Sequence, residues 1–331
     1  MLRKKYFYHN PSTNPHETLA LEEVMLNRIK QDEIILYLYS HTDSVIIGRN
    51  QNVWSECRHE KLISDGGTLA RRISGGGAVY HDIGNLNFSF IVGKKNYDQL
   101  GQTNTILEAV RTFGVPAEFS GRNDLVLQDG RKFSGNAFCS KKNGCIHHGT
   151  LMIDTDVEKM DEYLTVSKDK IQSKSIPSVR ARVANLSDVS ESITVSSMAK
   201  ALKLTFEDIY GKRIPYILTE DVKKEVNELA ARNASWNWLF GKSPKFDISI
   251  KNRYSFGMVE LLFSLSDARI TDATVYSDAN DADFIEELPK KLVGCKFASS
   301  HLADKLGQGR YAQEQREMID ELVEYILRCG Y

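Results

Sequence analysis

Three consecutive glycines, Gly75, Gly76 and Gly77, follow the arginine pair Arg71 and Arg72 after only two intervening residues. Because glycine has no Cβ, such a run permits backbone conformations closed to other residues and lets an extended ligand lie against exposed N–H groups. The arginines add fixed charge and planar guanidinium groups that suit phosphate or carboxylate. The segment therefore predicts an anion-cradling loop. A tight turn between strands, with solvated arginines, is the alternative reading of the same residues.

Two familiar nucleotide-binding motifs are absent from this loop and its surroundings. The run SGGGAVY does not fit the GxGxxG pattern of dinucleotide-binding folds. Gly241-Lys242-Ser243 resembles the end of a P-loop, but Trp236 stands where the first glycine of that motif is needed. The sequence supports neither kind of site.

Apolar and turn-forming residues predict helices and strands that are interspersed without strict alternation. Asn14 caps the first helix, since Pro15 and Glu17 follow it and apolar residues then recur at helical spacing. Further helices are expected at about 53–65, 97–113, 157–164, 196–210, 219–232, 282–292 and 313–328. Strands are expected at about 33–39, 44–47, 78–80, 86–92, 125–127, 132–133, 246–250 and 259–265. This order favours an α+β fold with a mixed or antiparallel sheet.

The length of 331 residues predicts about two domains. The stretch 235–245 contains Gly241 and Pro244 and is the predicted linker region. We therefore expect a first domain at 1–245 and a smaller α+β domain at 246–331.

Composition limits the classes of function. Lys and Arg total 43 against 44 Asp and Glu, so no global charge attracts nucleic acid or an anionic membrane. No run approaches the roughly 18 apolar residues of a membrane span, and the beginning of the sequence lacks signal-peptide features, so a cytoplasmic location is expected. The five scattered cysteines predict free thiols rather than disulfides or a zinc site.

A second chemical segment surrounds a predicted hairpin turn at Asp129-Gly130. Asp124 and Lys132 flank this hairpin and can approach each other across neighbouring strands. Asp124 could hold Mg²⁺ while Lys132 supplies a compact positive charge, and an exposed ion pair is the alternative. His147 and His148 are adjacent on a strand and face opposite ways, which argues against a shared zinc ion.

The stretch 167–186 is basic and lacks a clear period. Structureless loops of this length are often lids or binding loops, and a solvated surface loop is the alternative. As a lid it would be cut by proteases in the free protein and protected once ligand is bound.

Five segments resemble motifs of bacterial lipoate-protein ligases in order and approximate spacing: RRISGGGAVYHDIGNLNFSF, SGRNDLVL, RKFSGNAF, HHGTLMIDTD and RARVANL. The similarity continues through 235–238 and 253–265, so it covers nearly the whole chain and includes that family's C-terminal accessory domain. The resemblance implies a catalytic domain similar to that of biotin-protein ligases. It also implies two half-reactions, in which lipoate and ATP give lipoyl-AMP and pyrophosphate, and the acyl group then passes to a lysine of a carrier domain.

The resemblance also implies roles for individual residues. Lys132 matches the family's essential lysine, which contacts the acyl carbonyl and the phosphate of lipoyl-AMP. Asn123 and Asp124 match positions near the phosphate and Mg²⁺, while His148 and Gly149 match the wall of the acyl tunnel.

The remaining matched positions lie in and around the glycine loop. Those expected to contact the nucleotide are Arg72, Gly77, Ala78, Val79 and Tyr80. Those expected to lie along the lipoyl chain are Ser74, Gly75 and Gly76. The basic stretch 167–186 corresponds to a loop that folds over the adenylate. Asn136 departs from members that have a smaller hydroxyl residue there, and Cys139 carries no family role.

The implied partners are lipoyl-carrier domains, namely E2 subunits of 2-oxoacid dehydrogenase complexes and the glycine cleavage H protein, with the ligase a monomer. Three other functions stay open at this point. One is a carrier-dependent octanoyl transferase that uses no ATP, and another is a biotin ligase, whose own glycine-rich motif is absent. The third is a non-catalytic carrier-binding or lipoate-sensing protein, against which Lys132 and Asp124 argue.

Overall fold

The computed structural model describes residues 2–121, 123–165, 182–241 and 246–330. The described chain divides into two compact units. The first comprises residues within Met1–Ile47, Val53–Ile73 and Ala78–Leu239, and the second comprises residues within Gly48–Asn52, Ser74–Gly77 and Phe240–Tyr331.

The first unit mixes strands and helices. Its strands are β1 (Lys4–His9), β2 (Glu33–Tyr39), β3 (Ser44–Ile47), β4 (Thr68–Arg71), β5 (Val79–His81), β6 (Asn85–Gly93), β7 (Ala117–Ser120), β8 (Asp124–Leu127), β9 (Lys132–Ser140), β10 (Gly144–Met152) and β11 (Ile214–Pro215). Its helices are α1 (Pro15–Arg28), α2 (Val53–Glu56), α3 (His59–Ser64), α4 (Gln99–Arg111), α5 (Val157–Tyr163), α8 (Val195–Tyr210) and α9 (Glu220–Ala234), with a 3₁₀ turn at Lys94–Asn96.

An eight-stranded mixed sheet lies at the centre of this unit, in the order β11-β1-β2-β6-β10-β9-β8-β7. β1 runs parallel to both β11 and β2, and the other neighbouring strands are antiparallel. A smaller sheet has the order β4-β3-β5, and the loop that carries the glycine triplet connects β4 to β5. The α+β class with a mixed sheet is confirmed.

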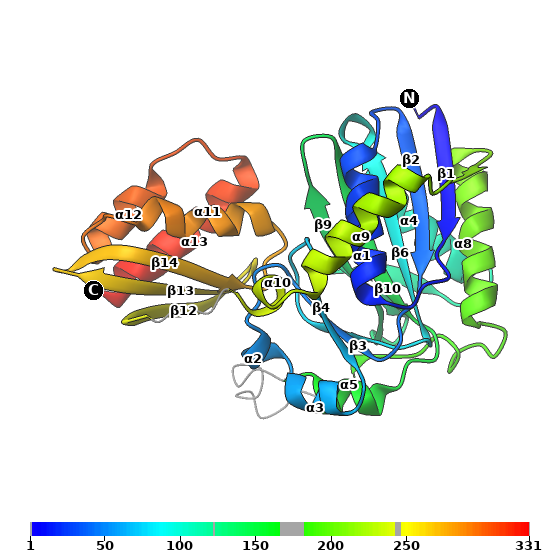
Figure 1. Cartoon of the computed structure of the whole chain (residues 1–331), viewed down its shortest axis with the longest axis horizontal. Helices are drawn as coiled ribbons and strands as arrows, with labels where there is room; N and C mark the ends of the chain where they lie inside the picture. The colour runs from blue at the N-terminus through cyan, green and yellow to red at the C-terminus, as the bar shows by residue number, and fades with distance from the viewer. Residues whose placement is uncertain (1, 122, 166–181, 242–245, 331) are drawn as a thin grey trace. The chain divides into compact units, whose positions relative to one another are not determined.

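Helices cover both faces of the central sheet because its strands alternate two apolar sets of side chains. Leu36 and Phe88 belong to a cluster with α4 and α8, on what we call the α4 face. Ile35 and Tyr37 belong to a cluster with α1, on what we call the α1 face. Figure 1 shows α9 lying beside α1. The sheet is therefore buried on both sides, and polar side chains on its central strands need a structural or functional reason.

The first helix begins as its sequence predicts. The Asn14 side chain accepts a hydrogen bond from the backbone N–H of His16 at 2.9 Å, and Pro15 occupies the first turn. The apolar residues that follow lie against the sheet. This cap fixes where α1 starts and hence which of its residues reach the α1 face.

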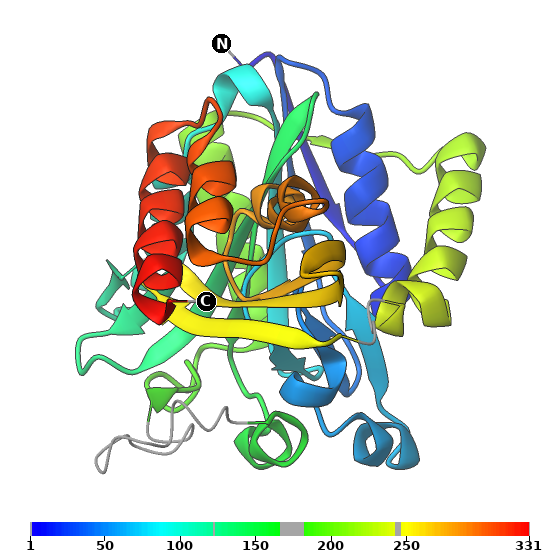
Figure 2. The same cartoon turned by 90° about the vertical axis from the view of Figure 1, so that its left-hand side faces the viewer.

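The second unit is a smaller α+β assembly (Figure 2). Its strands are β12 (Ile248–Tyr254), β13 (Gly257–Ser266) and β14 (Arg269–Ser277), which form an antiparallel sheet. Its helices are α11 (Ala282–Leu292), α12 (Ser299–Gly307) and α13 (Gln313–Cys329). One hydrophobic cluster joins the sheet to these helices, with Phe263 and Ile319 fully buried.

Two of the predicted segments lie partly outside the described residues. The stretch predicted as a linker contains a short helix, α10 (Trp236–Phe240), so its first half is regular structure. Residues 242–245 lie outside the described residues, and the boundary at 245/246 stays a proposal. Most of the basic stretch at 167–186 also lies outside them, since the description resumes at Arg182.

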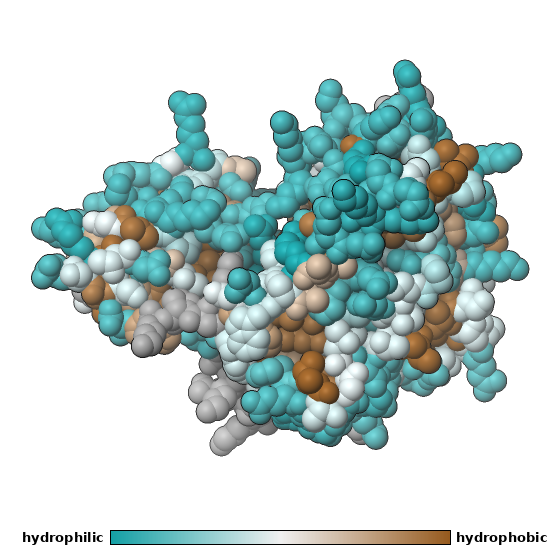
Figure 3. Space-filling view, viewed as in Figure 1, coloured by the Kyte–Doolittle hydropathy of each residue, from teal (hydrophilic) through white to brown (hydrophobic). Residues whose placement is uncertain are grey.

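The surface of the chain is largely hydrophilic in the view of Figure 3, with scattered apolar side chains. Among the helices that the structure describes, none is long and apolar enough to cross a membrane.

Candidate functional site

The predicted hairpin brings Asp124 and Lys132 together. Asp124 begins β8 and Lys132 begins β9, and a turn with Gly130 at φ +83° connects the two strands. The Lys132 Nζ lies 2.7 Å from the Asp124 Oδ1, with side chains 36% and 38% exposed. An ion pair this accessible to water contributes less than about 1 kcal/mol to folding. Its charges are therefore available for another task.

Gly135 provides the space in which the lysine side chain lies. A Cβ at this position would stand 2.9 Å from Lys132 Nζ and 3.1 Å from its Cε. Lys132 thus folds back over Gly135, which is paired with Asp124 across the two strands. Asp124, Gly135 and the ammonium group therefore share one side of the sheet.

His148 lies on this same side of the sheet. In β9, Ala137 points to the same side as Gly135, and Ala137 is paired directly with His148 of β10. The His148 Nδ1 lies 2.9 Å from Glu22 Oε1 of α1, which identifies this side as the α1 face. The predicted phosphate site and the predicted acyl wall thus share one face of one sheet.

Glu22 is a site residue that the sequence reasoning missed. It is 1% exposed, and its Oε1 also accepts a hydrogen bond from the Ser89 hydroxyl of β6. A buried carboxylate needs such partners, because desolvation without them is costly. The signal available in the sequence was a glutamate within the apolar stripe of α1, between Leu21 and Val24.

Arg72 is buried close enough to Glu22 for the two charges to attract each other. It is 7% exposed, and its Nη1 donates to the Ile46 carbonyl at 3.2 Å. Burial lowers the pKa of its guanidinium to about 10, and the nearby Tyr39 and Glu22 oppose that shift. Arg72 is therefore charged at neutral pH although it is removed from water, which strengthens its attraction for an anion.

A chain of buried side chains leads from α1 to the strand after the glycine loop. The Thr18 Oγ1 lies 2.7 Å from His41 Nε2, and His41 Nδ1 lies 3.0 Å from His81 Nδ1. His81 is buried, with 5% of the residue exposed, and yet its Nε2 has no hydrogen-bond partner among the described residues. This nitrogen therefore offers a hydrogen-bonding position to a ligand or to water.

Buried neutral histidines should make the protein less stable in mild acid. Burial lowers the pKa of both His41 and His147 to about 3 and lowers that of His81 well below its usual value. Below pH 6.5 the unfolded chain binds protons that the folded chain does not, so the unfolding free energy should fall as the pH drops from 6.5 toward 3. The slope is at most about 1.4 kcal/mol per pH unit per histidine.

Urea unfolding at pH 7, 6 and 5 measures this slope. The variant His41→Asn should flatten it by the contribution of one histidine. A slope unchanged by that substitution would contradict the assignment of His41 as a buried neutral group.

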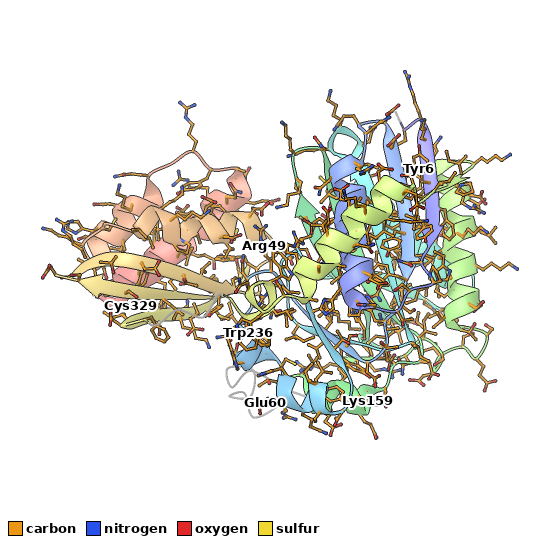
Figure 4. The ribbon with its side chains drawn as sticks, viewed as in Figure 1. Tyr6, Arg49, Glu60, Lys159, Trp236 and Cys329 are labelled. Atoms are coloured by element: carbon orange, nitrogen blue, oxygen red, sulfur yellow. The ribbon has the colours of Figure 1, made fainter. Side chains whose placement is uncertain are left out.

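Tyr80 is anchored at the end of the glycine loop. Its hydroxyl donates to the Asp43 Oδ1 at 2.8 Å, and Asp43 also pairs with Lys159 of α5, which Figure 4 labels. Burial raises the pKa of Tyr80, so its hydroxyl keeps its proton. Ala78 and Val79, which precede it, are half-buried.

A side chain at position 149 would point to the opposite side of the sheet from the His148 side chain. A Cβ at Gly149 would meet the Phe88 ring at 2.7 Å and the Asn136 Oδ1 at 2.8 Å, which places it toward the α4 face. That His148 and Gly149 line the acyl tunnel stays a prediction.

Residues Ser74–Gly77 belong to the second unit and are described within it. Ser74 is fully buried, and a Cβ at Gly75 would lie 2.1 Å from the Ala279 carbonyl oxygen. Gly76 has φ +87° and donates its N–H to that same carbonyl at 3.2 Å. The close backbone approach at Gly75 and the positive φ at Gly76 account for glycine at these two positions, and the contact with the lipoyl chain stays a prediction.

Gly76→Val should weaken lipoate binding more than about tenfold. A β-branched residue is strongly disfavoured at φ +87°, and the strain would displace the loop that we predict to lie along the lipoyl chain. Calorimetric titration with lipoate tests this. Gly307→Val is the control, because a Cβ there would point into open space. Unchanged affinity in Gly76→Val would mean that the glycines serve only a turn.

Family comparisons agree with this architecture. A family model for the lipoyl protein ligase A/B catalytic domain matches residues 14–207, and one for the bacterial lipoate protein ligase C-terminus matches residues 243–326. The strands of the central sheet from β2 to β10 thus lie within a catalytic domain of the lipoyl protein ligase A/B class.

Curated relatives match along nearly the full chain. The lipoate-protein ligase A of Bdellovibrio bacteriovorus is 37% identical over 312 residues, which is 92% of each chain. That of Psychrobacter cryohalolentis is 34% identical over 325 residues, covering 95% of this chain and 96% of the relative. The chain belongs to the lipoate-protein ligase family, as the five motif segments predict.

Solved structures are similar as well. LipL1 of P. falciparum in complex with lipoate has a TM-score of 0.83 and 29% identity, over 98% of this chain and 99% of that one. The bi-partite ligase of Thermoplasma acidophilum, described with its E2 lipoyl domain, has a TM-score of 0.64 and 28% identity over 75% and 100%. A lipoate-protein ligase A bound with ATP has a TM-score of 0.61 and 27% identity over 73% and 99%.

Proposed function

We propose that this chain is an ATP-dependent lipoate-protein ligase, which forms lipoyl-AMP and transfers the lipoyl group to a lysine of a carrier domain. The observation that carries this proposal is the placement of Lys132, Asp124 and His148 on one face of the sheet, within a member of this family. Relatives of similar structure that hold lipoate or ATP support it.

In the first half-reaction, a carboxylate oxygen of lipoate attacks the α-phosphorus of ATP. The bond from that phosphorus to the bridging oxygen breaks, and pyrophosphate leaves. Two anions approach only where positive charge is already in place, and Lys132 and Arg72 supply it. Lys132 contributes a compact ammonium between carboxylate and phosphate, and the buried Arg72 contributes a planar guanidinium.

The residues present fit a magnesium ion that arrives with ATP. Mg²⁺ is commonly held by one or two protein carboxylates together with substrate phosphates. Asp124 offers one accessible carboxylate, and the described ranges hold no cluster of three His, Cys, Asp or Glu side chains that would cage a metal alone. A bound Mg²⁺ would neutralise phosphate charge.

In the second half-reaction, a neutral lysine amine of the carrier attacks the acyl carbon of the mixed anhydride. AMP leaves and the amine loses a proton. The anhydride is already activated, so the protein needs no nucleophile of its own. The carriers that we propose are E2 lipoyl domains and the glycine cleavage H protein, and a relative described with an E2 lipoyl domain supports the first. That the protein is a monomer, and that it lies in the cytoplasm, are both still predictions.

One experiment tests the whole proposal. Purified protein is mixed with an apo carrier domain, lipoate, ATP and Mg²⁺, and the mass of the carrier is measured. The expected result is a gain of one lipoyl group that requires ATP, together with lipoate-dependent exchange of pyrophosphate into ATP. Acyl transfer from a carrier without ATP would indicate an octanoyl transferase, and no product at all would indicate a binding protein.

A further inference from the structure

A line of polar side chains lies on the α4 face, behind the hairpin that holds Lys132. It consists of the buried Gln102 of α4, His147 of β10 and Asn136 of β9, followed by the half-buried Asn123 before β8. Gln102 and Asn136 are 1% and 6% exposed, and His147 is fully buried. Polar groups buried this deeply on an apolar face are costly unless they are hydrogen-bonded, so their arrangement calls for a specific account.

Asn136 is tied to Asn123 by three hydrogen bonds. Its backbone N–H and its side-chain Nδ2 donate to the Asn123 carbonyl at 2.8 and 3.0 Å. In return, the Asn123 Nδ2 donates to the Asn136 carbonyl at 2.9 Å. These bonds extend the pairing of β8 and β9 by one residue beyond Asp124, which is paired with Gly135. The residue directly before Asp124 is thereby fixed.

His147 determines how the Asn136 amide is oriented. The His147 Nε2 lies 2.9 Å from Asn136 Oδ1, and its Nδ1 lies 3.2 Å from the Gln102 Oε1. The Nδ2 of Asn136 already faces a carbonyl, so Oδ1 must be the acceptor and His147 Nε2 must carry the proton. Burial lowers the pKa of His147 to about 3, which keeps the ring neutral.

We propose that His147 is a positioning residue for adenylation: through Asn136 and Asn123 it fixes the carboxylate of Asp124 against Lys132 from the opposite face of the sheet. The inference rests on the proposed roles of Asp124 and Lys132. It assigns the two adjacent histidines to different tasks, since His148 faces the α1 face and His147 supports the hairpin from behind.

The test compares His147→Leu with His147→Gln. Leucine removes the donor, whereas the amide of glutamine can place an N–H near the position of Nε2. We expect His147→Leu to lower the rate of pyrophosphate exchange about tenfold to a hundredfold, because small displacements of reacting groups have effects of that size. His147→Gln should recover most of the rate. The affinity for lipoate, measured by calorimetry, should change less than about twofold, because the His148 side chain lies on the other face.

A double-mutant cycle separates positioning from stability. Asn136→Ala should lower the rate about as much as His147→Leu, and the double variant should be no slower than either, because both interrupt the same chain. Met198→Ala, in the hydrophobic cluster of the α4 face, is the control that lowers stability without touching the hairpin. Additive losses in the double variant, a loss in Met198→Ala as large as in His147→Leu, or full activity of His147→Leu would each overturn the proposal.

If His147→Leu does not fold, His147→Gln and Asn136→Ala carry the test. Near wild-type rates for Asn136→Ala would then overturn it, and a large loss there with high activity in His147→Gln would support it. A wild-type protein that forms no lipoyl-AMP refutes the proposed function instead. The two failures are therefore distinguishable.

Discussion

Lys132→Ala is expected to lower the rate of lipoyl-AMP formation at least about a hundredfold while the protein stays folded. The substitution removes the ammonium that we place between the lipoate carboxylate and the α-phosphate, and losing one preorganised group of this kind costs about that much. The fold should tolerate it, because the ion pair with Asp124 is more than one third exposed and contributes little to stability. Lipoate-dependent pyrophosphate exchange gives the rate, and thermal unfolding gives the stability.

Two further variants sharpen this result. Lys132→Arg should also be inactive, since a planar guanidinium cannot replace a compact charge at close range. Lys223→Ala is the matched control, because it breaks an exposed lysine–glutamate pair on α9. Substantial adenylation by a folded Lys132→Ala protein would remove this residue from the mechanism.

Local sequence signals predicted much of the fold. The cap at Asn14, the apolar run of β2 and the Asp-Gly turn each act over a few residues, and the corresponding elements form where they were expected. The strands β1, β4, β7, β11 and β14 were not predicted, because their apolar and polar residues do not alternate clearly. Their strand conformation depends on pairing with neighbours distant in sequence, which a local pattern does not reveal.

In the candidate site, too, contacts between residues near each other in the sequence could be predicted, and contacts between distant residues could not. Asp124 and Lys132 could be paired from sequence because a hairpin connects them. Glu22 and His148 are 126 residues apart and meet only because α1 packs on the sheet. The line from Gln102 to Asn123 likewise depends on the register of β9 and β10. Such contacts follow from tertiary packing, so the order of residues alone did not indicate them.

Glycines show how differently one residue type can act in this site. Gly149 lies where a Cβ would press on the Phe88 ring and on the carbonyl of Gly135, so a side chain there would strain the sheet. Gly76 is needed for its positive φ. At Gly135 the nearest atoms belong instead to the far end of the Lys132 side chain, which can move at little cost. A methyl group at Gly135 should therefore affect the position of the ammonium rather than the fold.

Gly135→Ala is accordingly expected to separate activity from stability. The new Cβ would stand 2.9 Å from Lys132 Nζ, closer than van der Waals contact allows, so the ammonium must leave its place beside Asp124. The φ of Gly135 lies outside the left-handed region, so alanine fits the backbone, and it should leave the melting temperature unchanged or slightly raised. The rate of pyrophosphate exchange should fall about tenfold to a hundredfold.

Thermal unfolding and pyrophosphate exchange on the same preparation test this separation, with Gly307→Ala as the control at an open position. In the Lys132→Ala background, Gly135→Ala should have no further effect, because the group that it displaces is already absent. A Gly135→Ala protein with the wild-type rate would show that the reaction does not depend on where the free enzyme holds its ammonium. A rate that falls only together with the melting temperature would assign Gly135 to the packing of the sheet.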